Sequence, residues 1–365
     1  MTSLKRRWPF FTGAALAVTL AAGLTVPALA SNTVASPWSP VKSISVFLKD
    51  GISTLSDAQL ETKMQEATTY IKGLNANTIS LNFAFSMTSL TSNDPHAGTE
   101  TPSPQLLAAL IHIIRANGLN VQIRPELDET GFPNNTWRGL ISPTNLPLWF
   151  SNYEAFLAPY LEASKLAGAN GFVIGVELSS LLTDEDGWSQ VVQQAHTLFG
   201  PNIQYSQSHN TIRALPGADF GWDFYTQMTS AELSGGVNLS TLAAAMAKNL
   251  LNPSKDNSTT SYPLPVPLTS TMLEEVGVPA EAYGYLNPTW VSSDIPPGTP
   301  IDRQFQANWF TAACNVVFAD HLQGLSFWAI YLPDWSPEEN DSADYSLWSG
   351  TTSEDAIKTC FARTQ

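Results

Sequence analysis

Eight segments typical of β-strands alternate with helical segments along most of the chain, and this alternation limits the possible folds more than any other feature. The strand-like segments are 43–48, 78–85, 121–127, 171–178, 203–207, 218–225, 268–274 and 325–331. Helical spacing of apolar residues and helix-end signals predict helices at 57–72, 104–117, 148–167, 187–198, 310–322 and 353–362. Strands that alternate with helices pair in parallel, with the helices as crossovers.

Two parallel architectures compete, an open doubly wound sheet and a closed barrel. A nucleotide-binding open sheet normally has a glycine-rich turn after its first strand. Here that strand is followed by Leu48-Lys49-Asp50-Gly51, and no P-loop or GxSxG motif occurs elsewhere. Eight units without a nucleotide motif therefore predict an α/β protein with a single (β/α)8 TIM barrel over residues 41–365.

The first 30 residues have the pattern of an export signal. Basic residues at positions 5–7 precede an apolar run at 10–24, and Ala28-Leu29-Ala30 has the small residues expected at a cleavage site. A membrane anchor is the alternative, but the run is short for a bilayer, which needs about 20 apolar residues. We expect a signal peptide at 1–30, a flexible Ser- and Pro-rich linker at 31–40 and a secreted protein, by the general or the twin-arginine route.

Charge and metal-ligand patterns exclude several function classes. The net charge of −15 becomes more negative once the basic signal peptide is removed, so we expect neither nucleic acid nor a membrane surface as a partner. The five histidines are scattered, without an HExxH motif, and no CxxC occurs, so we expect no metal and no cofactor. We expect a monomer, with Cys314 and Cys360 joined in a disulfide between the last two helices.

Carboxylates fall where a barrel places its active site, at the C-terminal ends of the strands. Glu177 directly follows the apolar run 172–176, and Glu274-Glu275 closes the seventh strand segment. Each observation alone also fits a solvated residue, or for Glu177 a core pair with Arg124. Adjacent strand residues face opposite ways, so we expect only one of Glu274 and Glu275 to face the site. Two carboxylates at one end of a barrel are the catalytic groups of glycosidases.

Aromatic residues support a carbohydrate cleft, because sugar rings stack on indoles. The chain has eleven tryptophans, and five lie at predicted strand ends or in the following loops: Trp137, Trp188, Trp222, Trp328 and Trp335. Core packing is the alternative, and we expect it for about half of them. Trp328, near the end of the eighth strand, is the best candidate for a sugar platform.

Four motifs occur together in order along the chain. They are Trp137-Arg138-Gly139, Trp149-Phe150-Ser151-Asn152-Tyr153, Ile174-Gly175-Val176-Glu177-Leu178 and Glu275-Val276-Gly277. With them, the segment from about 104 to 331 resembles the β-mannanases of glycoside hydrolase family 113, and more broadly the retaining barrels with glutamates on strands four and seven. The combination is much more specific than any single motif.

The resemblance implies a secreted retaining glycoside hydrolase with Glu177 as acid/base and Glu275 as nucleophile. It favours Glu275 over Glu274 because the retaining barrels with glutamates on strands four and seven, here called the clan, have Glu-x-Gly at the seventh strand. Val176 stands where the clan usually has asparagine, which puts one hydrogen bond to the sugar in doubt. Further candidates for sugar contact or for supporting the catalytic pair are Arg124, Glu126, Trp137, Arg138, Tyr225 and Trp328.

The implied substrate is a β-linked polysaccharide or oligosaccharide, most directly β-1,4-mannan. Two alternatives stay open. One is a glycosidase on the same scaffold that acts on another cell-wall glycan. The other is a catalytically silent barrel that binds glycans. A metal-dependent hydrolase lacks the cluster of histidine and aspartate that it would need.

Overall fold

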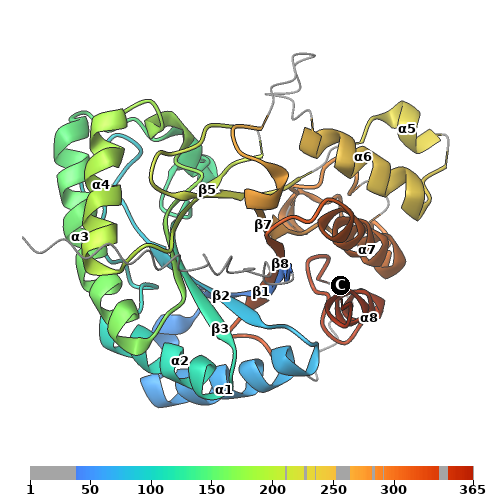
Figure 1. Ribbon diagram of the computed structural model, residues 1–365, viewed down its shortest axis with the longest axis horizontal. Helices are drawn as coiled ribbons and strands as arrows, with labels where there is room; N and C mark the ends of the chain where they lie inside the picture. The colour runs from blue at the N-terminus through green and yellow to red at the C-terminus, as the bar shows by residue number, and fades with distance from the viewer. Residues whose placement is uncertain are drawn as a thin grey trace, which may run out of the picture. The chain divides into compact units, whose positions relative to one another are not determined.

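The computed structural model contains a closed barrel of eight parallel strands that follow one another in chain order (Figure 1). The structure describes residues 38–364, without 210–211, 226–227, 235, 252–263, 282–283, 291 and 337–343. The expected signal peptide and residues 31–37 of the expected linker lie outside the described residues. The fold class expected from the alternation, a single (β/α)8 barrel, is confirmed.

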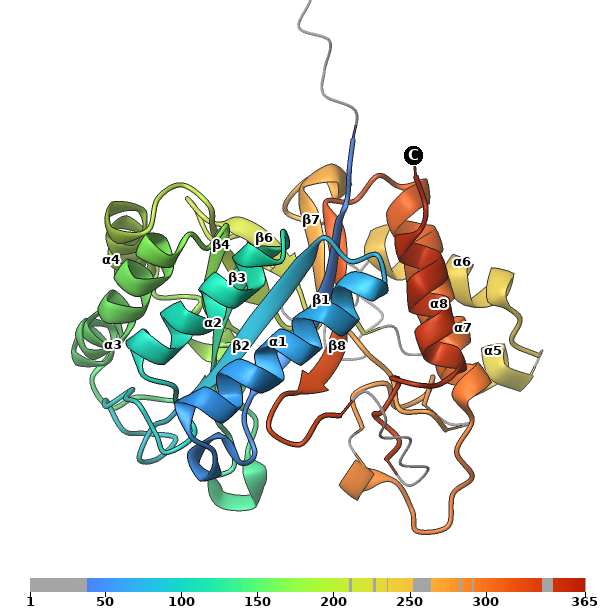
Figure 2. The same ribbon diagram turned by 90° about the horizontal axis from the view of Figure 1, so that it is seen from below.

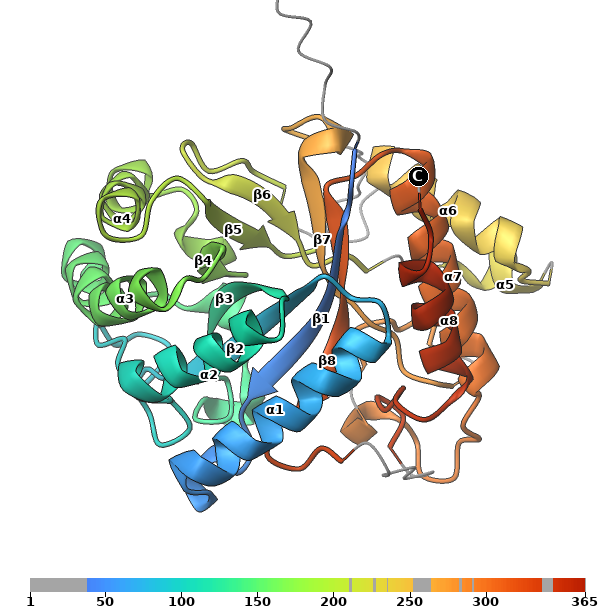
Figure 3. The same cartoon turned by 60° about the horizontal axis from the view of Figure 1, so that its bottom comes forward.

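The strands are β1 (Val41–Leu48), β2 (Thr78–Phe85), β3 (Asn120–Leu127), β4 (Gly171–Val176), β5 (Ile203–Gln207), β6 (Asp219–Trp222), β7 (Thr271–Val276) and β8 (Gly324–Tyr331). The helices are α1 (Asp57–Gly73), α2 (Pro104–Ala116), α3 (Leu146–Ala167), α4 (Glu185–Leu198), α5 (Ser230–Ser234), α6 (Leu239–Leu251), α7 (Arg303–Ala319) and α8 (Thr352–Phe361). Figure 2 shows helices packed along the outside of the strands, and Figure 3 shows β1 beside β8, where the barrel closes.

Most expected segments match the observed elements, but several bounds differ: α7 begins at Arg303, seven residues before the expected helix, and β6 ends at Trp222. The seventh strand begins at Thr271 and runs to Val276, so Glu275 lies within the strand. The expected start of that strand, Leu268–Ser270, is a short 3-10 helix. Helices α5 and α6 were not expected, although the buried residues Leu242, Met246 and Leu250 of α6 follow one another at four-residue spacing.

Local sequence signals explain several helix ends. The Ser56 side chain accepts a hydrogen bond from the Gln59 backbone N–H, and the Gln59 side chain accepts one from the Ser56 N–H, which forms a capping box at the start of α1. Helix α3 ends at Gly168, whose φ of 86° is the left-handed conformation that glycine adopts without strain. Trp38, at the end of the expected linker, donates from Nε1 to the Leu322 carbonyl at 3.0 Å, so this part of the linker is attached to the barrel.

The two faces of the barrel wall differ in chemistry. Side chains that face the helices are apolar; Trp188 of α4, for example, packs on Tyr205 of β5. Side chains inside the barrel are largely polar. There, side chains from strands that are not adjacent in the sheet contact one another. Gln122 of β3 hydrogen-bonds Gln204 of β5. The interior therefore holds a buried polar network beneath the ends of the strands that carry the site.

No helix among the described residues is both long and apolar enough to cross a membrane.

A disulfide joins the last two helices. Cys314 of α7 and Cys360 of α8 are bonded, with their Cα atoms 5.9 Å apart and a sequence separation of 46. The expected pairing is present in the structure. A bridge over a loop of this length contributes about 4 kcal/mol in the chain-entropy description of the unfolded state.

We predict that thiol titration of the denatured, unreduced protein finds no free thiol, and that it finds two after reduction. The double variant Cys314→Ala/Cys360→Ala should lose up to about 4 kcal/mol of unfolding free energy in urea denaturation. Two free thiols before reduction would contradict the pairing.

Candidate active site

The backbone turns sharply at Glu177, directly after β4. Its φ of 52° lies in the left-handed region, which costs a residue with a Cβ on the order of 1 kcal/mol. The Glu177 N–H donates to the Ser206 carbonyl of β5 at 3.0 Å, which holds this turn against the neighbouring strand. A strained residue held in this way at the end of a barrel strand is typical of a functional site.

Trp137 fixes the Glu177 carboxylate. Its indole Nε1 donates to Glu177 Oε2 at 2.9 Å. Gly139 lies against the same indole, because a Cβ added there would come within 2.3 Å of the ring. The Trp-Arg-Gly motif therefore has a physical reason: a larger residue in place of Gly139 would displace the indole that holds Glu177.

Glu275 points into the same end of the barrel from β7. Tyr225 donates from its hydroxyl to Glu275 Oε2 at 2.9 Å, and Arg124 forms an ion pair with Oε1. Glu275 thus has a cationic partner and a hydroxyl donor, and both favour its ionised form.

As expected, only one of the two adjacent glutamates faces the site: Glu275 contacts Arg124 and Tyr225, whereas Glu274 points toward the N-terminal ends of the strands. Glu274 is also inside the barrel, where Gln122 lies 3.4 Å from its Oε1. The register between β7 and β8 shifts between Leu273 and Val276, so regular alternation of side chains is broken at these two residues. Gly221 of β6 leaves room for Glu274, since a Cβ there would come within 2.8 Å of Glu274 Cγ.

Arg124 holds three carboxylates together within the barrel. Its guanidinium is fully buried, and besides Glu275 it contacts Glu126 at 2.7 Å and Asp223 at 3.0 Å. Burial alone would lower the pKa of Arg124, but Glu275, Asp223 and Glu126 outweigh that effect and raise it. Arg124 is therefore a permanent positive charge between these acids.

Arg138 extends this charge network to Glu177. It forms ion pairs with Glu126 and with Glu129, the latter at 2.7 Å, and its Nε lies 3.9 Å from Glu177 Oε2. Glu126 lies between the two arginines, and although its burial raises its pKa, Arg138 and Arg124 lower it overall. The candidates Arg124, Glu126 and Arg138 thus form one network that links both glutamates.

The tryptophans divide between site and core. Trp328 is partly exposed, and its ring lies 5.5 Å from the Arg124 guanidinium carbon. Trp137 is also partly exposed. Trp188 and Trp222 are fully buried in the hydrophobic core, and Trp335 is 7% exposed, so these three are not open faces for a sugar.

The pKa values of both glutamates are raised. Burial raises the pKa of Glu177, and Arg138 and the Trp137 hydrogen bond offset only part of this effect. Burial also raises the pKa of Glu275 to about 7, against the opposing effect of Arg124 and with the help of the nearby charges of Glu126 and Glu177. At mildly acidic pH the pair therefore retains a proton, as acid catalysis by one member requires.

Sequence reasoning missed two members of the site. Asp223 directly follows β6; it is fully buried and accepts from Ser206 Oγ at 2.7 Å as well as from Arg124. Burial, and then the charge of Glu275, raise its pKa well above the usual range. The rule that selected Glu177, a carboxylate directly after a barrel strand, would also have selected Asp223. Glu129, the partner of Arg138, lies in a loop and carries no comparable signal.

Among the described residues, no group of three or more His, Cys, Asp or Glu side chains is arranged to hold a metal ion.

Val176, which precedes Glu177, stands where the clan usually has asparagine. Its side chain is apolar and buried, so this position offers no polar group to the site.

The sequence matches the family description of Glycoside Hydrolase Family 113 over residues 55–347, which is most of the chain. The chain belongs to this family. The protein is therefore a glycoside hydrolase, and the resemblance inferred from the motifs is confirmed. A comparison with curated protein sequences found no match.

Solved structures show the same fold at low sequence identity. A family 113 β-1,4-mannanase aligns with a TM-score of 0.67 and 16% identity, covering 88% of this chain and 99% of its own. The family 113 β-mannanase of Alicyclobacillus acidocaldarius, in complex with ManMIm, aligns with a TM-score of 0.65 and 17% identity. The alignment covers 88% of this chain and 97% of the mannanase. A variant of GH5_18 from Streptomyces cattleya, in complex with Manβ1-4GlcNAc, aligns with a TM-score of 0.55 and 13% identity. The alignment covers 88% of this chain and 79% of the GH5_18 chain.

We predict that replacing Arg124 with methionine costs about 3–5 kcal/mol of unfolding free energy, because Glu126, Asp223 and Glu275 would lose their shared buried counterion. Urea denaturation measures the loss. The matched control is Arg213→Met, which removes an exposed ion pair with Glu185 and should cost less than about 1 kcal/mol. Equal losses in the two variants would contradict the role assigned to Arg124.

We further predict that Glu177→Gln lowers the pKa of Glu275. The negative charge of Glu177 disfavours ionisation of Glu275, so its removal makes ionisation easier, and Glu275 should titrate below about 7. NMR of protein labelled with ¹³C at the glutamate carboxyl measures the titration, with Glu275→Gln to assign the signal. Glu66→Gln, on the exposed face of α1, should leave it unchanged. An unchanged or higher pKa in Glu177→Gln would show that the two carboxyl groups do not interact.

Proposed function

We propose that this glycoside hydrolase is a retaining β-mannanase in which Glu177 is the acid/base and Glu275 the nucleophile. The observation that carries the assignment is the difference between their partners. Glu275 is in contact with the permanent positive charge of Arg124 and with the Tyr225 hydroxyl. Glu177 accepts from a neutral indole, and the nearest cationic atom is 3.9 Å away.

These partners suit the two steps of a double displacement. In the first step, the Glu275 carboxylate attacks the anomeric carbon while Glu177 donates its proton to the departing glycosidic oxygen. In the second step, Glu177 takes a proton from water, and that water breaks the bond between Glu275 and the sugar. Arg124 stabilises Glu275 whenever it is ionised, and burial raises the pKa of Glu177, which favours its protonated form.

The substrate part of the proposal rests on the family and on its solved members. The two family 113 structures described above are named β-1,4-mannanase and β-mannanase. Trp328 is partly exposed, and its ring lies 5.5 Å from the Arg124 guanidinium carbon, so it supplies an aromatic face beside Arg124 on which a sugar ring can stack. The signal-like first 30 residues support export, and a single chain supplies every group of the site described here.

The substrate is tested by incubating the protein with β-1,4-mannan, β-glucan, xylan and galactan, and with the disaccharide Manβ1-4GlcNAc, followed by product identification. We predict release of manno-oligosaccharides from mannan. Cleavage of another polymer but not of mannan would identify a hydrolase of a different cell-wall glycan. No release from any substrate would favour a silent glycan-binding barrel.

The roles of the two glutamates are tested with azide. We predict that Glu177→Ala slows hydrolysis of natural polymers by about 10²–10⁴-fold. On an aryl glycoside with a good leaving group, azide should accelerate this variant and give a glycosyl azide of retained configuration, because azide attacks the glycosyl-enzyme without a base. Glu275→Ala should be inactive, and azide should give only the inverted product. Inverted product from Glu177→Ala with retained product from Glu275→Ala would reverse the roles.

A further inference from the structure

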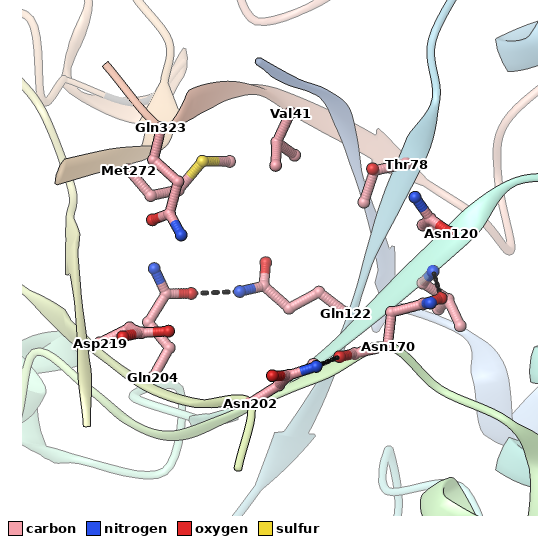
Figure 4. A pocket seen from close by; sticks show the side chains of 12 residues that line it. Val41, Thr78, Asn120, Gln122, Asn170, Asn202, Gln204, Asp219, Met272 and Gln323 are labelled. Carbon is pink, nitrogen blue, oxygen red and sulfur yellow. Dashed lines mark hydrogen bonds between the residues drawn. The ribbon is translucent and has the colours of Figure 1, made fainter. Parts of the chain in front are cut away.

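A cavity of about 320 Å³ opens at the end of the barrel opposite to the two glutamates. Its walls come from the first residues of several strands and from the residues just before them, as Figure 4 shows. All eight strands are parallel, so their N-terminal ends lie at the far end from Glu177 and Glu275. The cavity is therefore separate from the catalytic site.

Amide side chains dominate the lining of this cavity. Six of them contribute: Asn120, Gln122, Asn170, Asn202, Gln204 and Gln323. Asp219 is the single charged residue among the described lining residues, where no Lys, Arg or His occurs. A phosphate or carboxylate ligand would find no cationic partner there, whereas neutral hydrogen-bonding groups would find many donors and acceptors.

Contacts outside the cavity fix the orientation of several of these amides. Arg115 donates to Oδ1 of Asn120 and to Oδ1 of Asn170, both at 2.9 Å. Within the described part of the chain, these bonds leave the Nδ2 donors of the two asparagines uncommitted. Asn202 uses its Nδ2 to donate to the Asn170 carbonyl at 2.9 Å, which leaves its Oδ1 as an acceptor. The rim thus presents donors and acceptors in set positions.

One buried oxygen of the cavity lining, Oε1 of Gln323, lacks a hydrogen-bond partner among the described residues. In Figure 4 the Gln323 side chain extends toward the hydrogen-bonded pair Gln122 and Gln204. A buried polar atom without a partner costs about 1–3 kcal/mol, so a donor that enters the cavity and reaches Gln323 would be stabilised.

We propose that this cavity binds a neutral polyhydroxylated molecule of monosaccharide size. Hydroxyl groups both donate and accept, which matches the mixture of free amide nitrogens and oxygens. Met272 and Val41 add an apolar wall for the C–H face of such a molecule. The volume lies at the lower end of the range of about 300–1,000 Å³ found for ligand sites, which fits a single sugar ring better than a chain. The inference does not depend on which polymer the catalytic site cleaves.

Met272 provides a reporter for this site. It is one of six methionines, so methionine methyl groups labelled with ¹³C give few, resolvable NMR signals. D-Mannose is titrated into the full protein, with Met272→Leu to assign the signal. We expect a saturable shift of the Met272 signal with D-mannose and none with inorganic phosphate at equal ionic strength. Mannose bound only at the catalytic end would leave this signal in place.

Gln323→Leu tests the unpartnered amide directly. It removes the hydrogen-bonding group with little change of volume, and it should weaken mannose binding about tenfold, the ratio that corresponds to one lost hydrogen bond. The control is Gln193→Leu on the exposed face of α4, which should bind mannose like the unchanged protein. Both variants should keep the hydrolytic rate, so a failure of this proposal is distinct from a failure of the proposed function.

Four results would overturn the proposal. They are an unmoved Met272 signal in the full protein, the same mannose affinity in Gln323→Leu, an equal response to phosphate, and a response to glycerol as strong as that to mannose at equal concentration. The last result would show an adventitious additive only.

Discussion

The buried guanidinium of Arg124 is the contact on which the rest of the site depends. Three carboxylates meet at this single cation, and a second arginine, Arg138, continues the network to Glu177, the other glutamate of the proposed catalytic pair. Buried anions without a counterion would take up protons or force the barrel end open. Arg124 therefore serves stability and chemistry together. It makes the burial of Glu275 tolerable, and that burial raises the pKa of Glu275, as the proposed mechanism requires of the pair.

The second constraint is the irregular register of β7. A regular strand would send one of Glu274 and Glu275 toward the helices, where an apolar layer would exclude it. The shift between Leu273 and Val276 brings both into the barrel, Glu275 toward Arg124 and Glu274 toward Gln122. Burial raises the pKa of Glu274, so this carboxyl favours its neutral form beneath the charged network. The polar interior and the catalytic end are thus products of the same local distortion.

Much of this arrangement could be predicted from residues alone, and the failures have physical causes. The alternation of strand-like and helical segments predicted the barrel, and the position of a carboxylate directly after an apolar run indicated Glu177. The inward position of Glu274 could not be predicted, because a register shift leaves no mark in the hydrophobic pattern of a single strand. The burial of Trp222 could not be distinguished from the partial exposure of Trp328 by position, since both lie on strands and burial depends on what covers each strand. The contact of Trp137 with Glu177 joins residues 40 positions apart, which only the folded chain determines.

The closure of the barrel has a consequence for how the chain reaches this state. β1 and β8 are the first and last strands, and they are hydrogen-bonded neighbours. The ring cannot be completed until Gly324–Tyr331 has been synthesised, so nearly the whole polypeptide must be available before the final pairing. Until then two strand edges stay open to other chains, and contacts so distant in sequence form slowly. A chain cut before β8 would therefore lose more than Trp328: it would carry a sheet with two unprotected edges, the usual starting point for aggregation.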